Sequence, residues 1–329
     1  MGINMQQAFE LFIFDRETYC GENTVRNYKN TLGYFLRFLM RKYNCDLCKI
    51  DADSITNLDL QEYVIYLRNK TKLDDHPFKP TEDKHITNTT IRTYSIDLRT
   101  FFNFLFRNEY IEKDLMKKFK LIKREKKLVL PVFSDEVKTI DSCFNLRTMT
   151  GIRNYCIVHL MLDAGLRSGE VCKLHLNDIN FLQNHIIVID GKGKKDRIVP
   201  LAKKLKKCLH EYITLYRPYT GQEHDFLFCS VNGSLEPISG DTIKSLFSRI
   251  KKKTGLERLK PHLLRHTFAT SFILGGGDME SLRLYMGHSG YDVTQDYLHL
   301  ANTYSRMGSD IYKLDKIFFR SYYGGYGVS

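Results

Sequence analysis

The stretch PHLLRHTFATSFILGGGDMESLRLYMGHSGYDVTQDY, residues 261–297, decides the fold of the second half of the chain. Its first part carries apolar residues at helical spacing and ends in glycines 275–277, which predicts a helix that stops there. Asp278 is a good N-cap for a second helix, which contains the apolar residues that follow it. A last short helix is expected from about Val293 and would carry Tyr297. The stretch is therefore predicted to form three helices joined by short turns.

Four side chains in this stretch are suited to contact a phosphate group: His262, Arg265, His288 and Tyr297. His262 and Arg265 are three residues apart, so on a helix they project from one face. Arginine presents a planar fork of donors that matches a phosphate, and imidazole titrates close to neutral pH. Each of these residue types is, by itself, more often structural than catalytic. Together they indicate a phosphate-binding site.

The composition favours a polyanionic partner. The chain has 329 residues, which is enough for two domains, and a formal net charge of +12. Nucleic acid is the commonest partner of so basic a protein, and an anionic membrane surface is the rival. We expect no membrane span, because no apolar run approaches the ~20 residues that a bilayer needs. The N-terminus does not resemble a signal peptide, so the expected location is the cytoplasm.

The eight cysteines are scattered along the chain, as reduced cysteines would be. Cys45 and Cys48 have the spacing of zinc ligands, and His76 and His85 follow them. No second pair of ligands with zinc spacing accompanies them, so the preferred interpretation is two thiols near a helix end. We therefore expect no metal site.

The chain is predicted to have four parts: a helical bundle over residues 1–112, a basic linker over 113–128, a second domain over 129–301 and a tail over 302–329. In the first part, residues 70–84 are predicted to be a polar loop. The linker is expected to lie along DNA phosphates, with a solvated polar segment as the alternative. Its candidate DNA-binding residues are Lys117, Lys118, Lys120, Lys123, Arg124, Lys126 and Lys127.

The second domain is predicted to be mostly helical, with strand-like alternation over residues 179–201 around a turn at 191–196 and a short strand at 225–229. The predicted fold class is therefore mainly α with a small antiparallel β-sheet. In the tail, Ile311, Leu314, Ile317 and Phe318 fall on one face of an expected helix. That face could pack on its own chain or on a neighbouring protomer.

The order of the motifs resembles the tyrosine recombinases, the phage-integrase and Xer family. His262-x-x-Arg265, then Gly-His at 287–288, then a tyrosine nine residues later resembles that family's signature. Upstream, residues 164–170 (AGLRSGE) resemble its first arginine box, and residues 189–201 (IDGKGKKDRIVPL) resemble the hairpin that carries its catalytic lysine. The helical first part is similar to the family's SAM-like core-binding domain.

The resemblance implies a role for each matching residue. Tyr297 would be the nucleophile, Arg167 and Arg265 would hold the phosphate, and Glu170 would orient an arginine or histidine of the site. His262 would accept the proton of Tyr297, and His288 would donate a hydrogen bond to the phosphate. Lys192 would be the general acid for the leaving 5′ oxygen, with Lys194 and Lys195 as alternatives.

Three residues of the hairpin are also candidates for DNA contact: Lys194, Lys195 and Arg197. We expect the other histidines, among them His159, to be structural, and His266 to point away from the face that carries His262.

The resemblance further implies a site-specific recombinase that acts through a 3′-phosphotyrosine and needs no cofactor, metal or ATP. Its partners would be double-stranded DNA with inverted binding sites and three further copies of the chain in a homo-tetramer. An accessory DNA-bending or regulatory protein is compatible with this scheme. Two alternatives stay open: DNA relaxation like that of a type IB topoisomerase, and a non-catalytic architectural DNA-binding protein. The sequence does not distinguish phage integration, transposition and dimer resolution.

Overall fold

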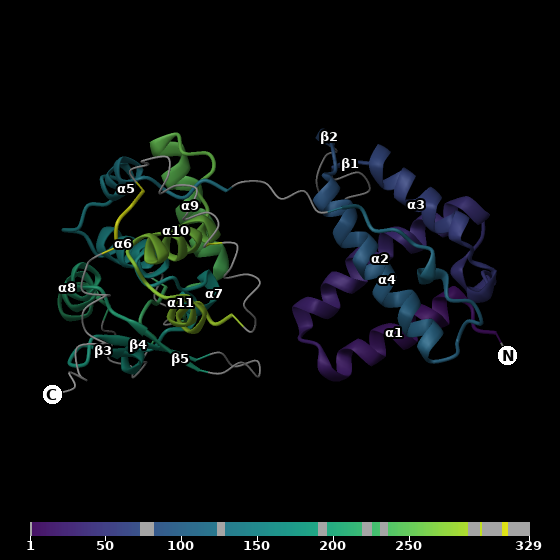
Figure 1. Ribbon diagram of the computed structural model, residues 1–329, viewed down its shortest axis with the longest axis horizontal. Coiled ribbons are helices and arrows are strands. Elements are labelled where there is room, and N and C mark those ends of the chain that lie inside the picture. The colour runs from purple at the N-terminus through teal and green to yellow at the C-terminus, as the bar shows by residue number, and fades with distance from the viewer. Residues whose placement is uncertain are drawn as a thin grey trace. The chain divides into compact units, whose positions relative to one another are not determined.

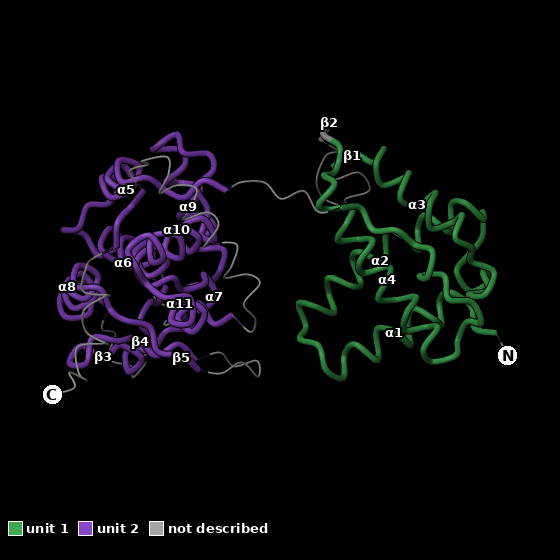
Figure 2. The backbone as a smooth tube through the Cα atoms, viewed as in Figure 1, with its two compact units in different colours: residues 1–127 green, residues 128–329 purple. Residues whose placement is uncertain are grey.

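The structure is a computed structural model (Figure 1) that describes residues 2–72, 82–123, 129–189, 196–218, 226–230, 236–288, 297 and 311–314. The chain divides into two compact units, residues 1–127 and 128–329 (Figure 2). Each unit has its own core of buried apolar side chains. The predicted fold class, mainly α with a small antiparallel sheet, is confirmed.

The described part of unit 1 is a bundle of four α-helices: α1 (Met5–Tyr19), α2 (Glu22–Tyr43), α3 (Asn57–Asn69) and α4 (Asn88–Arg107). Side-chain caps fix several helix starts, because the first backbone N–H groups of a helix lack partners within it. Asn4, Thr56 and Thr87 each accept a hydrogen bond from a backbone N–H three residues later. The apolar faces of α2 and α4 meet in the core, where Phe35 packs edge-on against Phe102.

Two predictions for unit 1 need correction. Residues 70–84 are not simply a loop, because β1 (Thr71–Lys72) pairs antiparallel with β2 (Glu82–His85). The linker also begins later than predicted, because residues 115–119 belong to the first domain. Leu115, Met116 and Phe119 are buried in its core, around the short helix η3 (Leu115–Lys117). Burial of these apolar side chains stabilises the packing of the segment, while the surrounding lysines stay at the surface.

Unit 2 surrounds one strongly apolar helix, α6. Its helices are α5 (Ser134–Asp141), α6 (Met149–Leu162), α7 (Ser168–Lys173), α8 (Lys203–Glu211), α9 (Gly240–Thr254), α10 (Pro261–Leu274) and α11 (Met279–Met286), with shorter turns η4 (Leu176–Asp178) and η5 (Tyr212–Tyr216). The sheet has the order β3–β4–β5, formed by Ile179–Asn180, His185–Val188 and Arg197–Pro200. Every residue of α6 from Ile152 to Leu162 is buried. Figure 1 shows α6 and α10 at the centre of this unit.

The opening stretch of the sequence folds largely as predicted. Pro261 occupies the first turn of α10, where its missing N–H costs no hydrogen bond. The helix ends at Gly275, and Asp278 caps α11 by accepting a hydrogen bond of 2.8 Å from the backbone N–H of Ser281. Of the predicted third helix, only Tyr297 lies within the described residues, and it is helical.

One prediction for unit 2 differs from the structure, and the packing of one segment of the tail, left open above, can be described. Residues 226–230 form only isolated bridges, His175 with Phe226 and Cys229 with Pro237, instead of a strand. The described part of the tail, residues 311–314, packs on its own unit. There Ile311 bridges to Phe133, and the Tyr312 hydroxyl donates to Asp163 Oδ1 at 2.7 Å. This segment therefore docks in cis, and the rest of the tail lies outside the described residues.

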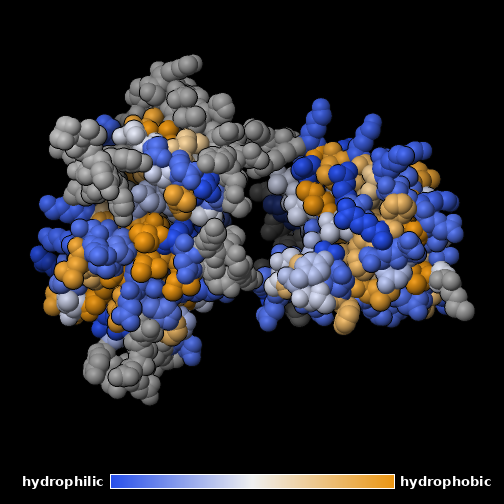
Figure 3. Space-filling view, turned by 60° about the horizontal axis from the view of Figure 1, so that its bottom comes forward, coloured by the Kyte–Doolittle hydropathy of each residue, from blue (hydrophilic) through white to orange (hydrophobic). Residues whose placement is uncertain are grey.

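On the face drawn in Figure 3, hydrophilic and hydrophobic side chains of the described residues are intermixed. No described helix is both long and apolar enough to cross a bilayer. All eight cysteines fall in described segments and all are free thiols. Within those segments, no cluster of three or more His, Cys, Asp or Glu side chains has the arrangement of a metal site.

Candidate active site

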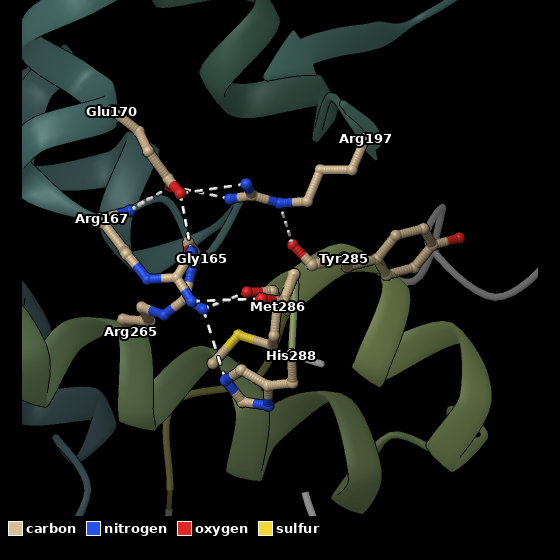
Figure 4. Close-up of polar contacts among 9 residues, drawn as sticks. Gly165, Arg167, Glu170, Arg197, Arg265, Tyr285, Met286 and His288 are labelled. Atoms are coloured by element: carbon tan, nitrogen blue, oxygen red, sulfur yellow. Dashed lines mark hydrogen bonds and ion pairs between the residues drawn. The ribbon is translucent and has the colours of Figure 1, made fainter. Parts of the chain in front are cut away.

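Arg265 lies at the centre of the candidate site. It projects from α10, is 5% exposed, and donates from Nη1 to the carbonyl of Gly165 and from Nη2 to the carbonyl of Met286 (Figure 4). Its Nη2 also lies 3.5 Å from Nε2 of His288. Burial and the nearby Arg167 guanidinium lower the pKa of Arg265 to about 9, so it stays cationic at neutral pH. A buried cation beside another cation creates a site that favours an anion.

Arg167 is the N-cap residue of α7 and reaches the same place from the other side. Its Nη1 donates to Glu170 Oε1 at 2.8 Å, and its Nη2 donates to the carbonyl of Gly287 at 3.3 Å. The backbone N–H of Arg167 also donates to Glu170, at 2.7 Å. The Arg167 side chain keeps 29% of its surface exposed, so it is held in place but still accessible to a ligand.

Glu170 is shared between two arginines. Besides Arg167, it accepts from Arg197 Nη1 at 3.0 Å and Nη2 at 2.7 Å (Figure 4). Burial raises the pKa of Glu170, but the hydrogen bonds and charges of Arg197 and Arg167 outweigh burial and lower the pKa to about 2. The carboxylate is therefore ionised throughout the neutral range.

The C-terminal end of α11 accepts hydrogen bonds from three arginines. The carbonyls of Tyr285, Met286 and Gly287 accept from Arg197, Arg265 and Arg167, respectively. The last carbonyls of a helix have no partner within the helix and form the negative end of its dipole, so cations are stabilised there. This arrangement places His288, the next residue, beside Arg265.

Tyr297 lies against two histidines. The centre of its ring is 5.1 Å from that of His266 and 6.4 Å from that of His288, and it is nearly parallel to the His288 ring. It is close enough that an ionised Tyr297 would raise the pKa of Arg265. His266, which we predicted to point away from the face that carries His262, packs on Tyr297, and its Nε2 lies 2.9 Å from the carbonyl of Val129.

His262 is exposed near the start of α10. Partial burial and the positive charges of Arg265, Lys260 and Arg167 lower its pKa, which favours the neutral imidazole. A neutral imidazole accepts a proton, so the electrostatics suit the role that the sequence suggests.

The structure changes the interpretation of Arg197. It is 8% exposed, and its three guanidinium nitrogens donate to Glu170 and to the Tyr285 carbonyl. Direct contact with DNA, which we predicted, does not fit this burial. A period-2 pattern did place Arg197 on a strand, but no local signal identifies Glu170, 27 residues earlier, as its partner.

Several predicted residues are not placed in the site. Lys192, Lys194 and Lys195 lie in 190–195, and Arg124, Lys126 and Lys127 lie in 124–128, both outside the described residues. The four described lysines of the basic segment, Lys117, Lys118, Lys120 and Lys123, are all exposed. They belong to unit 1, where Arg92 and Arg99 hold the segment by donating to the carbonyls of Ile122 and Phe119.

Comparison with known families identifies the chain. Residues 132–303 match the phage integrase family, and residues 7–121 match the phage integrase SAM-like domain. The chain belongs to the phage integrase family. The resemblance seen in the sequence is thereby confirmed, and it extends over both units of this integrase-family chain.

Curated relatives and solved structures agree with this membership. Tyrosine recombinase XerC of Bacillus subtilis (strain 168) is 26% identical over 297 residues, covering 85% of this chain and 96% of the relative. Tyrosine recombinase XerD of Listeria innocua serovar 6a is 27% identical over 295 residues, covering 88% and 91%.

Two solved structures share the fold of this integrase-family chain. The Tn1549 transposon integrase, in complex with a circular intermediate DNA, has a TM-score of 0.70 at 18% identity and covers 94% of this chain and 100% of that one. The XerH site-specific recombinase bound to palindromic difH has a TM-score of 0.68 at 21% identity, covering 89% and 80%.

Proposed function

We propose that this chain is a site-specific tyrosine recombinase that cleaves and rejoins DNA strands through a covalent 3′-phosphotyrosine on Tyr297. The observation that carries the proposal is the meeting of Arg167 and Arg265 at the end of α11, where His288 lies beside Arg265 and its ring centre is 6.4 Å from that of Tyr297. Two arginines and an imidazole at one point suit a phosphate whose negative charge grows during attack.

The proposed reaction needs only groups of the chain and of DNA. The Tyr297 oxygen attacks the phosphorus, its proton passes to His262, and the bond from phosphorus to the 5′ oxygen breaks. Lys192, from the hairpin, supplies the proton to that oxygen. The phosphodiester energy is kept in the new linkage, so a second 5′ hydroxyl reverses the step without metal or ATP. The positive charges of Arg167 and Arg265 lower the activation barrier of both cleavage and rejoining.

DNA is the proposed partner, in keeping with the net charge of +12 and with the circular intermediate DNA named in the structure of the Tn1549 integrase. We propose that four copies of the chain act on two paired sites with inverted repeats. The reduced state of the eight cysteines is in keeping with a cytoplasmic location.

A suicide duplex, nicked near the cleavage point so that the cut end diffuses away, tests the chemistry. The wild type should accumulate a covalent protein–DNA adduct. Tyr297→Phe should bind the duplex and form none, and Tyr285→Phe, which also removes one phenol oxygen, should still form it. Binding without any adduct in the wild type would favour the architectural alternative. Relaxation of plasmids that lack a specific site would favour the topoisomerase alternative.

The exposed lysines 117, 118, 120 and 123 are proposed to bind DNA phosphates. Each lysine that neutralises a phosphate should account for about 0.9 of the slope of log affinity against log salt concentration, so its replacement should reduce the slope by that amount. Filter-binding or fluorescence titrations of the four Lys→Ala variants over a salt series measure that slope. An unchanged slope in all four would contradict this role.

A further inference from the structure

Arg197 is a buried residue whose donors are all directed inward. Nε donates to the Tyr285 carbonyl at 2.8 Å, and the two terminal nitrogens donate to the two oxygens of Glu170. The side chain is 7% exposed. An arginine used in this way does not bind substrate itself. Its effect on the reaction must act through Glu170 and through α11.

The first effect is electrostatic. Glu170 Oε1 lies 2.8 Å from Arg167 Nη1, and a lone carboxylate at that distance would neutralise Arg167 and compete with a phosphate for it. Arg197 supplies a second cation to the same carboxylate. With Arg265 included, the four groups carry a net charge of two positive units, which would fall to one without Arg197. Half of the excess charge available to a phosphate therefore depends on a residue that does not touch it.

The second effect is geometric. Arg197 donates to the first of three consecutive carbonyls at the end of α11, and the other two accept from Arg265 and Arg167. The side chain of Arg197 runs close to Gly287, where a Cβ would lie 3.2 Å from Arg197 Cδ. Gly287 has a φ of +58°, which ends the helix and directs His288 toward Arg265. Loss of Arg197 would remove one of the three arginine hydrogen bonds that hold this helix end.

We propose that Arg197 is a positioning residue of the active site, which balances the charge of Glu170 and holds the end of α11 so that Arg167 and His288 face the phosphate. This inference rests on the proposed cleavage chemistry. It adds a residue of β5, for which the sequence suggested only DNA contact, to the group that organises the site.

The test compares Arg197→Met with Arg258→Met in single-turnover cleavage of the suicide duplex. Arg258 is the matched control, because it also pairs with a glutamate, Glu136, and donates to backbone carbonyls, those of Leu130 and Pro131. Arg197→Met should slow cleavage by about 100-fold, the loss expected when a catalytic group is displaced by roughly 1 Å. Its DNA affinity should stay within about threefold of the wild type, since the proposal gives Arg197 no contact with the DNA phosphates.

If Arg197 only stabilised the fold, Arg197→Met would lower the melting temperature and the cleavage rate together. Arg258→Met with the same melting temperature would then lose as much cleavage activity as Arg197→Met. That result would overturn the proposal. A loss of affinity equal to the loss of cleavage would also overturn it, because it would mark Arg197 as a phosphate-binding residue.

The double variant Glu170→Gln/Arg197→Met separates charge from stability. If Arg197 acts by balancing Glu170, removing both charges should recover about tenfold of the cleavage lost in Arg197→Met. No recovery would overturn the electrostatic part. Arg197→Lys keeps the charge without the planar fork, so it should cleave faster than Arg197→Met and slower than the wild type. Cleavage at the wild-type rate would overturn the geometric part, and this variant also carries the test if Arg197→Met does not fold.

The two proposals fail in different ways. If the wild type forms no covalent adduct, the proposed function fails. If the wild type forms the adduct and Arg197→Met forms it equally fast, only the positioning role fails.

Discussion

Arg265 donates a hydrogen bond to the backbone carbonyl of Gly165, which joins the middle of α10 to the turn after α6. Gly165 has a φ of +66°, and Phe268, one turn beyond Arg265 on α10, packs directly against it. Arg265 is therefore held by a turn that only glycine fits, because both the backbone conformation and the space exclude a side chain.

Gly165→Ala should destabilise the protein by about 3 kcal/mol, since the added Cβ would lie 2.5 Å from Phe268 Cδ1 in a left-handed conformation. Gly169→Ala is the control. It lies in α7, where a Cβ would meet nothing within 4 Å, and it should stabilise by roughly 0.5–1 kcal/mol. Urea denaturation measures both changes. Equal stability of the two variants would contradict the packing argument.

Arg265→Lys should reduce cleavage by at least about 100-fold, equivalent to roughly 3 kcal/mol of transition-state stabilisation. A lysine keeps the charge but cannot donate to the carbonyls of Gly165 and Met286 while also facing a phosphate. Single-turnover cleavage measures the loss. Arg249→Lys, at an exposed position of α9, should cleave normally. A mild effect of Arg265→Lys would show that a positive charge alone, without the arginine hydrogen bonds, is enough to stabilise the transition state.

The pH profile of cleavage should reflect His262. Partial burial and three neighbouring cations lower its pKa below the ordinary value of 6.5, so the imidazole is neutral at neutral pH and can accept a proton. The acid limb of the wild-type profile should therefore fall below pH 6.5. His262→Gln should cleave slowly and lose this limb. An acid limb that persists in His262→Gln would assign proton transfer to another group.

His159 is expected to make stability depend on pH. It is fully buried, and its two ring nitrogens lie 2.6 Å from Asp163 and 2.8 Å from Asp141, while Lys204 lies 3.1 Å from Asp141. Burial lowers the pKa of His159, but the two carboxylates outweigh it and raise the pKa to about 9.

A raised pKa stabilises the folded state fully below the unfolded pKa near 6.5, and this stabilisation is lost as pH rises through about 9. The loss should be on the order of 3 kcal/mol. Melting temperatures of the wild type and His159→Gln between about pH 6 and pH 9.5 measure it, with His210→Gln, at an exposed position, as the control. Parallel curves for the wild type and His159→Gln would refute this assignment.

Local patterns predict local structure well in this chain. Pro261, glycines 275–277 and Asp278 mark helix ends by their own backbone chemistry, and the structure ends and caps helices there. The same patterns fail where contacts with residues far away in the sequence decide whether a segment is buried or forms a strand. Leu115 and Phe119 lie among lysines in the predicted linker, yet they are buried because the core of unit 1 extends to them. Residues 226–230 have a strand-like composition but only isolated bridge partners.

Sequence reasoning predicts DNA contact for Arg197, which does not fit its buried contacts, and it does not foresee the contacts of His266 and Tyr312. The reason is the same in each case, because the contacts of these residues come from other elements: Glu170 for Arg197, Tyr297 for His266 and Asp163 for Tyr312. The predicted roles of Lys192 and of the linker arginine and lysines at 124–127 stay predictions.

The sequence by itself determined the order and type of the chemical groups, the main helices, and membership of the phage integrase family, because periodicity, caps and motif spacing are properties of neighbouring residues. Only the tertiary structure decided which groups act together. Three arginines separated by up to 98 residues meet three consecutive carbonyls at the end of α11, because packing of α10 on α6 and of β5 on α11 brings their donors there. The last carbonyls of a helix have no partner within it, so they are available as acceptors.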